Sequence, residues 1–443
     1  MQLLELQFDS SCSEFSTSDK IKVLLKKYFL KIWKNIGWLI FVFALPSMQV
    51  VLFFLTFGSE VKNLHLAVVN KEMEWETKDC PVYSNCTFKK FSCRFLNKLP
   101  KDTIIIDFYK DIGSAIDAVR NGNAWSALYF SDNFTEALVA RMALGRITDD
   151  ETLEQSEIKS WCDMSNKQIG LMLNRNLLLA YQDFGQEILK SCDENPKLAN
   201  IPIQFNEPVY GKADANFSNY VAPGVILAIV FFLAVALTSS ELMTDKTELL
   251  LDGVYMAGVG PFEIFLCQTI IHLIIVFIQT ALVLIFMLIV FHIECKGNLS
   301  FIFLLAFLQG ISGIFFGLII SEASKIKKDA SHIAIGCFYP ILLLSGILWP
   351  IESMPEMLQN VSYLLPLTMS TVSMRNMCLK GWNILQVEVY FGFISTIFWI
   401  ISFWHISMYI KKLKPSMTTT THSIPCNNTP KEILINQKRK LEN

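Results

Sequence analysis

Long apolar runs alternate with polar segments along the chain, and six runs reach or approach the length that crosses a bilayer. A helix needs about 20 apolar residues to span about 30 Å of hydrocarbon. The pattern predicts spans at residues 36–58, 220–239, 264–291, 299–320, 333–350 and 389–410. The fifth run is short and Pro340 interrupts it. The first run begins too late, and is too long, for a cleaved signal peptide. The pattern indicates a multi-pass α-helical membrane protein.

Composition supports a membrane protein and excludes two other classes. Of 443 residues, 52% are hydrophobic and only 18% are charged, whereas about 25% are charged in a typical soluble domain. Such hydrophobicity is incompatible with an intrinsically disordered chain. The formal net charge of −2 argues against a globally basic nucleic-acid binder, so we expect no nucleic-acid partner.

Lysines and N-glycosylation sequons predict the orientation. In membrane proteins, an excess of Lys and Arg marks the cytoplasmic flanks of the spans. In a six-span arrangement, all the lysine clusters beside the spans fall on one side: Lys20, Lys22, Lys26, Lys27, Lys31, Lys34, Lys325, Lys327, Lys328, Lys411, Lys412 and Lys414. Of the six sequons, only Asn427 falls on the cytoplasmic side. The other five fall on the opposite side: Asn85, Asn133, Asn216, Asn298 and Asn360. We therefore expect a plasma-membrane protein with a cytoplasmic N-terminus (1–35) and a cytoplasmic tail (411–443).

Between the first two spans, residues 59–219 have the rhythm of an extracellular α/β domain. Branched apolar segments predict strands at 64–69, 103–108, 125–130 and 201–205, and longer periodic segments predict helices at 111–120, 134–144 and 168–192. The insert is long enough to bury a core of its own.

Five cysteines lie in this insert: Cys80, Cys86, Cys93, Cys162 and Cys192. An oxidising compartment favours disulfides, although an odd number leaves one over or paired between chains. We expect one bridge within the Cys80, Cys86 and Cys93 cluster and one between Cys162 and Cys192. The alternative is that some stay reduced and buried. The CxxC spacing of structural zinc sites is absent from the insert.

Motifs for self-contained catalysis are missing from the sequence. GxxxxGK[ST], HExxH, GxSxG and GxGxxG do not occur, and the six histidines are scattered. We therefore expect no catalytic residues, no metal and no cofactor bound by this chain.

Residues 345–381 combine apolar helical sequence with Pro350, Pro355 and Pro366. Irregular backbone survives at membrane depth only where protein or a water-filled cavity shields it. This predicts an extracellular re-entrant hairpin over 351–388 that forms an outer gate. With Gly346, Arg375 and Gly381, the prolines resemble the outer-loop pattern of the type-2 permease domain of ABC transporters. This domain is the membrane half of the ABCG and ABCH exporters and of bacterial drug and polysaccharide exporters.

Further segments are similar to the arthropod ABCH group: VAPG from Val221, FFLAVALTSSELM from Phe231, and NAWSALYF from Asn123. The resemblance covers about residues 20–414. It implies a homo- or heterodimer in membrane lipid and an ATPase domain or chain that binds ATP and Mg, so that translocase activity needs this partner. Members carry the ATPase before the membrane region, whereas this chain opens with MQLLELQFDSSCSEFSTSD. We read it as a separate permease subunit, a diverged half or an incomplete gene model.

The resemblance also assigns roles to residues. It implies a coupling segment over 240–263, with charges at Glu241, Asp245, Lys246 and Glu248; the alternative is a solvated charged loop. It places a substrate cavity at a dimer seam between the second and fifth spans, and candidates to line it are Phe231, Phe232, Tyr339 and Leu343. The outer gate would contain Pro350, Pro355, Pro366 and Arg375. We expect Gln309 beside Gly310 to pack between helices.

Lys20–Asn35 is predicted to form an interfacial helix, because apolar residues share one face and lysines another: Ile21, Leu24, Leu25, Tyr28 and Ile32 against Lys20, Lys27, Lys31 and Lys34. A plain positive flank is the alternative. The preferred hypothesis is the membrane subunit of an ATP-driven exporter of lipid or other hydrophobic compounds. Alternatives are a regulatory half that dimerises with complete transporters and a cell-surface receptor.

Overall fold

The computed structural model describes residues 17–58, 61–73, 80, 86–200, 207–211, 217–247, 254, 259–293 and 295–413. The chain divides into two compact units, and each has a hydrophobic core of its own. Residues 1–58 and 209–443 form the helical unit, and residues 59–208 form the insert domain.

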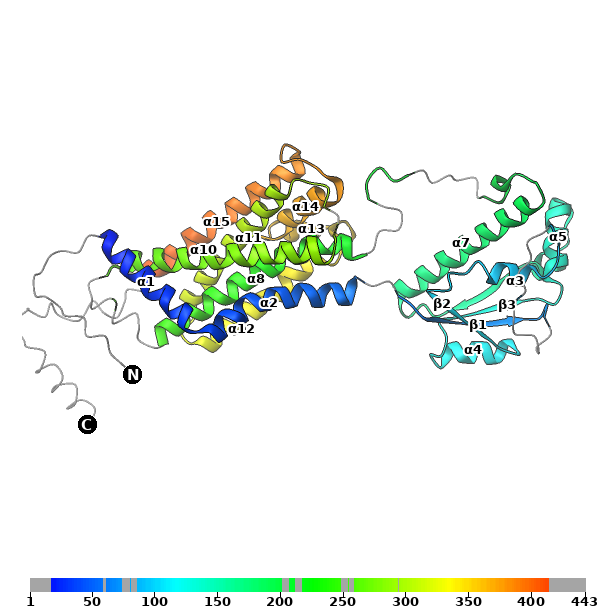
Figure 1. The fold of residues 1–443 in the computed structure, drawn as a ribbon, viewed down its shortest axis with the longest axis horizontal. Helices are drawn as coiled ribbons and strands as arrows, with labels where there is room; N and C mark the ends of the chain where they lie inside the picture. Colours follow the sequence, from blue (N-terminus) through cyan, green and yellow to red (C-terminus); the bar gives the residue numbers. More distant parts are fainter. Residues whose placement is uncertain are drawn as a thin grey trace, which may run out of the picture. The chain divides into compact units, whose positions relative to one another are not determined.

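The helical unit contains long apolar helices near the expected spans (Figure 1). They are α2 (Ile36–Phe57), α8 (Phe217–Thr247), α10 (Pro261–Ile285), α11 (Leu299–Ala323), α12 (Lys327–Leu344) and α15 (Val387–Leu413), and the π-helix η3 (Phe286–Val290) continues α10. Five of them, all but α12, are long and apolar enough to cross a membrane. A helical membrane protein is therefore supported, while the six-span count stays a prediction.

Small residues on α11 bring it into close contact with α8. Gly313 and Gly317 lie one turn apart and face the backbone of α8; an added Cβ at Gly313 would lie 2.4 Å from the Phe231 carbonyl oxygen. Glycines at this spacing let membrane helices approach through their backbones. The main core of the unit forms around this contact. Since a side chain at Gly313 would push α8 and α11 apart, this packing depends on glycine.

The expected hairpin contains two short helices, α13 (Glu356–Tyr363) and α14 (Thr368–Arg375), followed by the π-helix η5 (Asn376–Lys380). Most of α14 is buried. Its Ser370 hydroxyl donates to Gln309 Oε1 of α11 at 2.9 Å and lies 3.0 Å from Thr396 Oγ1 of α15. Gln309 is fully buried, which confirms the expectation that it packs between helices.

The insert domain has a four-stranded sheet in the order β2-β1-β3-β4. The strands are β1 (Leu64–Asn70), β2 (Ile104–Phe108), β3 (Ser126–Phe130) and β4 (Lys159–Cys162). β1 pairs in parallel with β2 and β3, while β4 runs antiparallel to β3. The first three confirm the predicted strands; β4 was not predicted, and residues 201–205 lie outside the described part of the chain.

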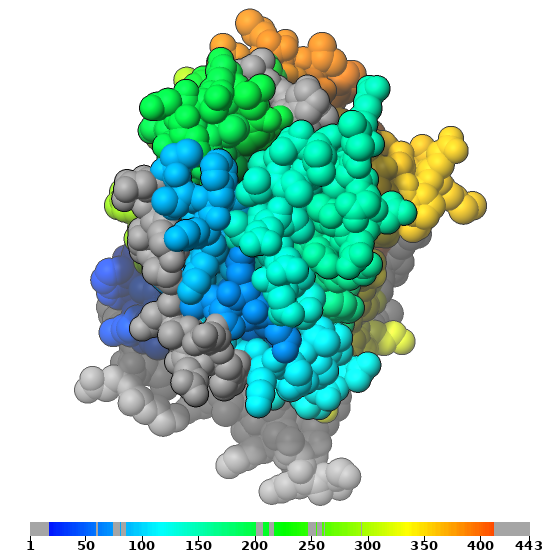
Figure 2. Space-filling view, turned by 90° about the vertical axis from the view of Figure 1, so that its right-hand side faces the viewer, coloured from blue at the N-terminus to red at the C-terminus, as the bar shows by residue number. Residues whose placement is uncertain are grey.

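Helices cover both faces of this sheet (Figure 1). α4 (Ile112–Arg120) packs on one face through small residues such as Ala115 and Ala118. On the other face lie α3 (Phe91–Leu96), α5 (Phe134–Leu144) and α7 (Lys167–Ser191), which supply large aromatic side chains such as Phe95 and Phe184. Figure 2 shows this domain in colours that run from blue through cyan to teal. The sheet and its helices agree with the α/β class predicted for the insert, and its location outside the cell stays a prediction.

Two disulfides lie in the insert domain. Cys80 is joined to Cys93, as expected for a bridge within the cluster, and Cys86 is joined to Cys192. The expected Cys162–Cys192 bridge is therefore wrong, and Cys162 is a free thiol. Cys162 lies on the edge strand β4, whereas Cys192 follows the end of α7 and meets the segment before α3.

Candidate functional site

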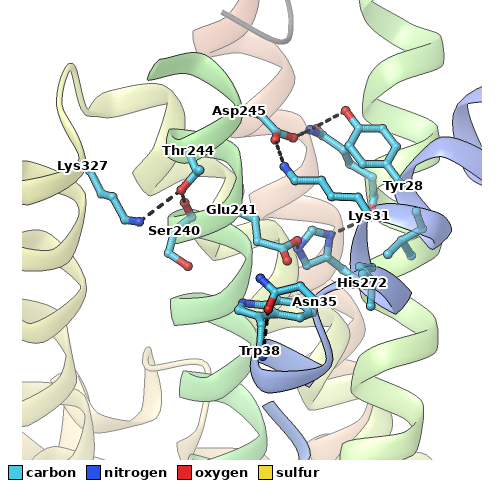
Figure 3. Close-up of a pocket in the computed structure, with 13 residues that line it drawn as sticks. Tyr28, Lys31, Asn35, Trp38, Ser240, Glu241, Thr244, Asp245, His272 and Lys327 are labelled. Atoms are coloured by element: carbon cyan, nitrogen blue, oxygen red, sulfur yellow. Dashed lines mark hydrogen bonds and ion pairs between the residues drawn. The ribbon is translucent and has the colours of Figure 1, made fainter. Parts of the chain in front are cut away.

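A polar cavity of about 310 Å³ lies between α1 (Thr17–Lys34), the start of α2, α8, α10 and α12. We call this region the α1 end of the helical unit, and the opposite region, formed by α13, α14 and η5, the hairpin end. Figure 3 shows charged and polar side chains, among them Lys31, Asp245 and His272, lying around the cavity. Such a concentration of polar groups is costly inside apolar helices unless the groups are paired.

Asp245 connects three helices at this site. Its side chain is almost fully buried near the end of α8 and accepts a bond of 2.7 Å from Lys31 Nζ of α1. Gln268 of α10 donates its Nε2 to Asp245 Oδ2 at 3.2 Å and to the Tyr28 hydroxyl of α1 at 3.3 Å. A buried carboxylate held by a charged donor and an amide is a well-satisfied group. Asp245 therefore fastens α1 to both α8 and α10.

A second pair lies one turn away. Nε2 of His272 in α10 lies 3.0 Å from Glu241 Oε2 of α8, and its Nδ1 lies 2.7 Å from the Gln268 carbonyl oxygen. Each ring nitrogen of His272 therefore has an oxygen atom of the chain within about 3.0 Å. The pair adds a second link between α8 and α10.

Two lysines extend these links to α11 and α12. Lys246 Nζ lies 3.1 Å from Glu322 Oε2 and 3.0 Å from the Ser321 carbonyl oxygen, both at the end of α11. Lys327, the first residue of α12, donates to Thr244 Oγ1 at 3.1 Å. The final turns of α8 therefore contact α1, α10, α11 and α12.

Apolar packing positions α1 for these contacts. Leu24 is buried against Val254, Ile264 and Cys267, with Ile21, Leu25 and Tyr28 beside it. This is the apolar face expected from the sequence, so the amphipathic helix is confirmed, and its place at a membrane surface stays a prediction. α1 ends at Lys34, and Asn35 then caps α2 by accepting from the Trp38 amide at 3.3 Å.

The structure brings together three of the four residues expected in the coupling segment. Glu241, Asp245 and Lys246 lie on the last turns of α8, which runs on to Thr247; Glu248 lies outside the described residues. A solvated loop is the wrong interpretation for Asp245, which is 3% exposed. Sequence reasoning did not assign Gln268 or His272 to the site. Their spacing of four, which puts both polar groups on one face of an apolar helix, was the available signal.

At the hairpin end, the expected gate residues have distinct placements. Pro350 precedes the short helix η4 (Ile351–Ser353), and Pro355 precedes α13. The carbonyl oxygen of Pro366 accepts a hydrogen bond from the Ser370 hydroxyl. Arg375 donates from Nε to the Tyr220 carbonyl oxygen at 3.1 Å and from Nη2 to that of Gly346 at 3.0 Å, and its guanidinium lies 3.8 Å from the Tyr220 ring centre. Arg375 therefore joins α14 to the start of α8 and the end of α12.

The four expected cavity residues divide into two pairs. Phe231 is fully buried inside the chain, stacked on Phe316, and Phe232 packs against Phe338. Tyr339 and Leu343 of α12 are instead 60% and 57% exposed. Of these four residues, only Tyr339 and Leu343 present a large free surface to a substrate or a second copy.

Three of the expected glycosylation sites can be placed. Asn133, Asn298 and Asn360 are exposed, and Asn298 also caps α11 by accepting from the Ser300 amide at 2.9 Å. Asn85 and Asn216 lie outside the described residues. Among described residues, no group of three or more His, Cys, Asp or Glu side chains is placed to hold a metal ion.

Comparison with known proteins gives consistent relatives. Residues 36–405 match a family described as "ABC-2 family transporter protein". The chain is 28% identical over 85% of its length to ABC transporter G family member 20 of Dictyostelium discoideum and 25% identical over 82% to member 23. It is also 23% identical over 52% of its length to the probable multidrug ABC transporter permease YbhR of Escherichia coli, covering 61% of that protein. The chain covers 48% of each Dictyostelium protein, about half their length.

Proposed function

The chain belongs to the ABC-2 family of transporter proteins, and from this premise we propose that it is the membrane subunit of an ATP-driven exporter of lipid or other hydrophobic compounds. ATP and Mg bind a partner ATPase domain or chain, and two permease halves, identical or different, enclose the pathway. The family supports a transporter membrane subunit. The substrate class, the direction and the partners are the proposed part.

The observation that carries this proposal is the buried Asp245 junction. An ATPase that closes beneath the helices must move them through a stiff connection, since a loose loop would absorb the displacement. Asp245 and Lys31 give α8 and α1 such a connection, and Gln268 extends it to α10. The α1 end is therefore the proposed docking and coupling region, and the Lys31–Asp245 contact is the proposed link between ATP hydrolysis and movement of the spans.

We also propose that α12 is the sixth crossing. Its 18 residues would extend about 27 Å at 1.5 Å per residue. Lys327 at its start contacts Thr244 near the end of α8, while Arg375 contacts both Gly346, just after α12, and Tyr220, at the start of α8. α12 thus runs antiparallel to nearly the whole of α8, which is long and apolar enough to cross.

With six crossings, the lysine clusters put the α1 end, the N-terminus and the tail in the cytoplasm of a plasma-membrane protein. The insert domain and the hairpin end are then outside the cell. The exposed surface at Tyr339 and Leu343 is the proposed contact with a lipophilic substrate at the dimer seam. The hairpin, with Arg375 fastening it, is the proposed outer gate.

The coupling proposal is tested by Lys31→Met in proteoliposomes that hold this chain with its co-purified ATPase. We expect K31M to keep basal ATP hydrolysis and to lose at least about tenfold in export of a fluorescent phospholipid per ATP, because the ATPase would then pull on α1 without moving α8. Lys27→Met is the matched control, because Lys27 is an exposed lysine one turn earlier on the same helix, and it should transport normally. An unchanged transport-to-hydrolysis ratio in K31M would contradict the coupling role of the junction.

The composition of the complex tests the transporter hypothesis against the regulatory half. Full-length tagged chain purified from its own cells should bring down an ATPase in a fixed ratio. Recovery of complete transporters whose activity falls when this chain is bound would instead support a regulator.

Orientation is tested by the sequons. Glycosidase treatment should shorten the wild-type chain, and Asn133→Gln should remove one glycan. Asn427→Gln, in the tail, should change nothing. Glycan at Asn427, or none on the insert domain or the hairpin end, would reverse the proposed orientation.

A further inference from the structure

Two cysteines outside the insert domain face each other at the hairpin end. Cys295 lies in the segment between η3 and α11, and Cys378 lies in η5. Both are free thiols in the structure, and their sulfur atoms are 2.8 Å apart, in direct contact. Cys378 is fully buried and Cys295 is half-buried, so the pair is reached through Cys295.

The backbones around the two cysteines are already held together. The Lys296 amide donates to the Cys378 carbonyl oxygen at 2.9 Å. A side chain at Gly297 would lie 2.5 Å from the Met377 carbonyl oxygen, and Gly381, with φ +71°, places its open side against Lys296. The two segments therefore contact each other through their backbones at several points. These backbone contacts hold the two sulfur atoms close together.

We propose that Cys295 and Cys378 form a third disulfide, which fastens the segment between α10 and α11 to the hairpin. The proposal uses the orientation proposed above, because disulfides form and persist on the oxidising side of the membrane. The oxidant is a protein disulfide of the secretory pathway. One thiolate attacks it to give a mixed disulfide, and the second thiol then displaces the oxidant. The net step forms the Sγ–Sγ bond, transfers two electrons to the oxidant and leaves it as a dithiol with two protons.

Local chemistry favours Cys295 as the attacking group. Its contact with Cys378 lowers the pKa of the Cys295 thiol, and the thiolate is the reactive form. Cys295 is also the more accessible member of the pair. Once formed, the bridge joins residues 83 positions apart and closes a loop that contains α11, α12 and the hairpin, so that η5 cannot separate from the start of α11.

The experiment is peptide mapping of the full-length chain from membranes. Cells are lysed in denaturant with N-ethylmaleimide, and the protein is digested with chymotrypsin without reduction. We expect a cross-linked peptide pair containing Cys295 and Cys378 that disappears on reduction. The Cys80–Cys93 and Cys86–Cys192 bridges of the insert domain are internal references.

A matched variant adds a second readout. Cys378→Ser should release Cys295, which a membrane-impermeant maleimide then labels on intact cells, whereas Cys337→Ser on α12 should leave Cys295 unlabelled. If Cys295 and Cys378 both carry N-ethylmaleimide while the insert-domain bridges are intact, the third disulfide is overturned and the orientation stands. If the insert-domain bridges are also reduced, the orientation fails together with the disulfide.

Discussion

The two ends of the helical unit are held together by different chemistry. At the α1 end, charged side chains from separate helices pair across a polar cavity, as Lys31 and Asp245 do. At the hairpin end, Arg375 binds backbone carbonyls, and buried hydroxyls and glycines fill the contacts around α14. The Lys31–Asp245 pair links two helices through side chains alone, whereas the Arg375 guanidinium holds two backbone carbonyl oxygens in one geometry. Under the proposed function, the α1 end receives movement from the ATPase, and the hairpin end moves as one piece with α8 and α12.

The largest expected effect is at the hairpin end. Arg375→Ala leaves the Tyr220 and Gly346 carbonyl oxygens without their donor and removes the cation–π contact. We expect a loss of about 3 kcal/mol in the free energy of unfolding, from unsatisfied buried acceptors. Thermal unfolding in lipid nanodiscs measures it. Arg375→Lys should recover only part, because an ammonium cannot reproduce the planar fork; an R375A melting temperature equal to wild type would refute the fixed hairpin.

Glycine packing at the same end is tested by Gly392→Ala. An added Cβ on α15 would overlap Ser373 of α14 and lie 2.8 Å from the Met369 carbonyl oxygen. Overpacking of this kind costs about 2 kcal/mol. Gly336→Ala is the matched control, since a Cβ there meets nothing within 4 Å and alanine favours a helix by up to about 1 kcal/mol. The two variants should shift the melting temperature in opposite directions; a shared direction would mean that α14 and α15 are not packed as described.

Both ends were only partly predictable from sequence. The long spans and the helix interruptions at the prolines could be predicted from the sequence. The length of an apolar run and the missing amide hydrogen of proline each determine structure within a short segment. The partners of Arg375 were not, because Tyr220 and Gly346 offer backbone oxygens that any residue would offer. Glu241 and Asp245 stood out as charges, yet their contacts with His272 and Lys31 depend on how α1 and α10 pack. The Cys86–Cys192 bridge was missed for the same reason: it joins residues 106 apart, and sequence alone does not fix disulfide connectivity.

The α1 end should show an asymmetry between the two partners of one ion pair. Lys31→Met removes the charged donor of the buried Asp245 and leaves it the neutral donors Gln268 and Tyr28, whereas Asp245→Asn leaves a half-exposed lysine that water can solvate. We expect K31M to lower the free energy of unfolding by about 1.5 kcal/mol and D245N by less than about 1 kcal/mol. Denaturation of both variants beside K27M measures the difference. Equal costs would show that Asp245 is solvated and that the two ends do not differ as argued.

The smallest effect concerns Tyr28, whose hydroxyl faces this junction. Burial, reinforced by the nearby Asp245 carboxylate, raises the pKa of Tyr28 well above its usual value. As pH rises past the ordinary tyrosine value of about 10, the phenol ionises in the unfolded chain but stays protonated in the folded one. The folded state then binds one more proton, so its stability falls with rising pH, by at most about 1.4 kcal/mol per pH unit. Tyr28→Phe should remove this part of the slope between about pH 10 and 11, and Tyr339→Phe, at an exposed tyrosine, should not. Identical alkaline slopes in wild type and Y28F would mean that water solvates the phenol. The ion pairs at the α1 end would then not be shielded from water as the coupling role requires.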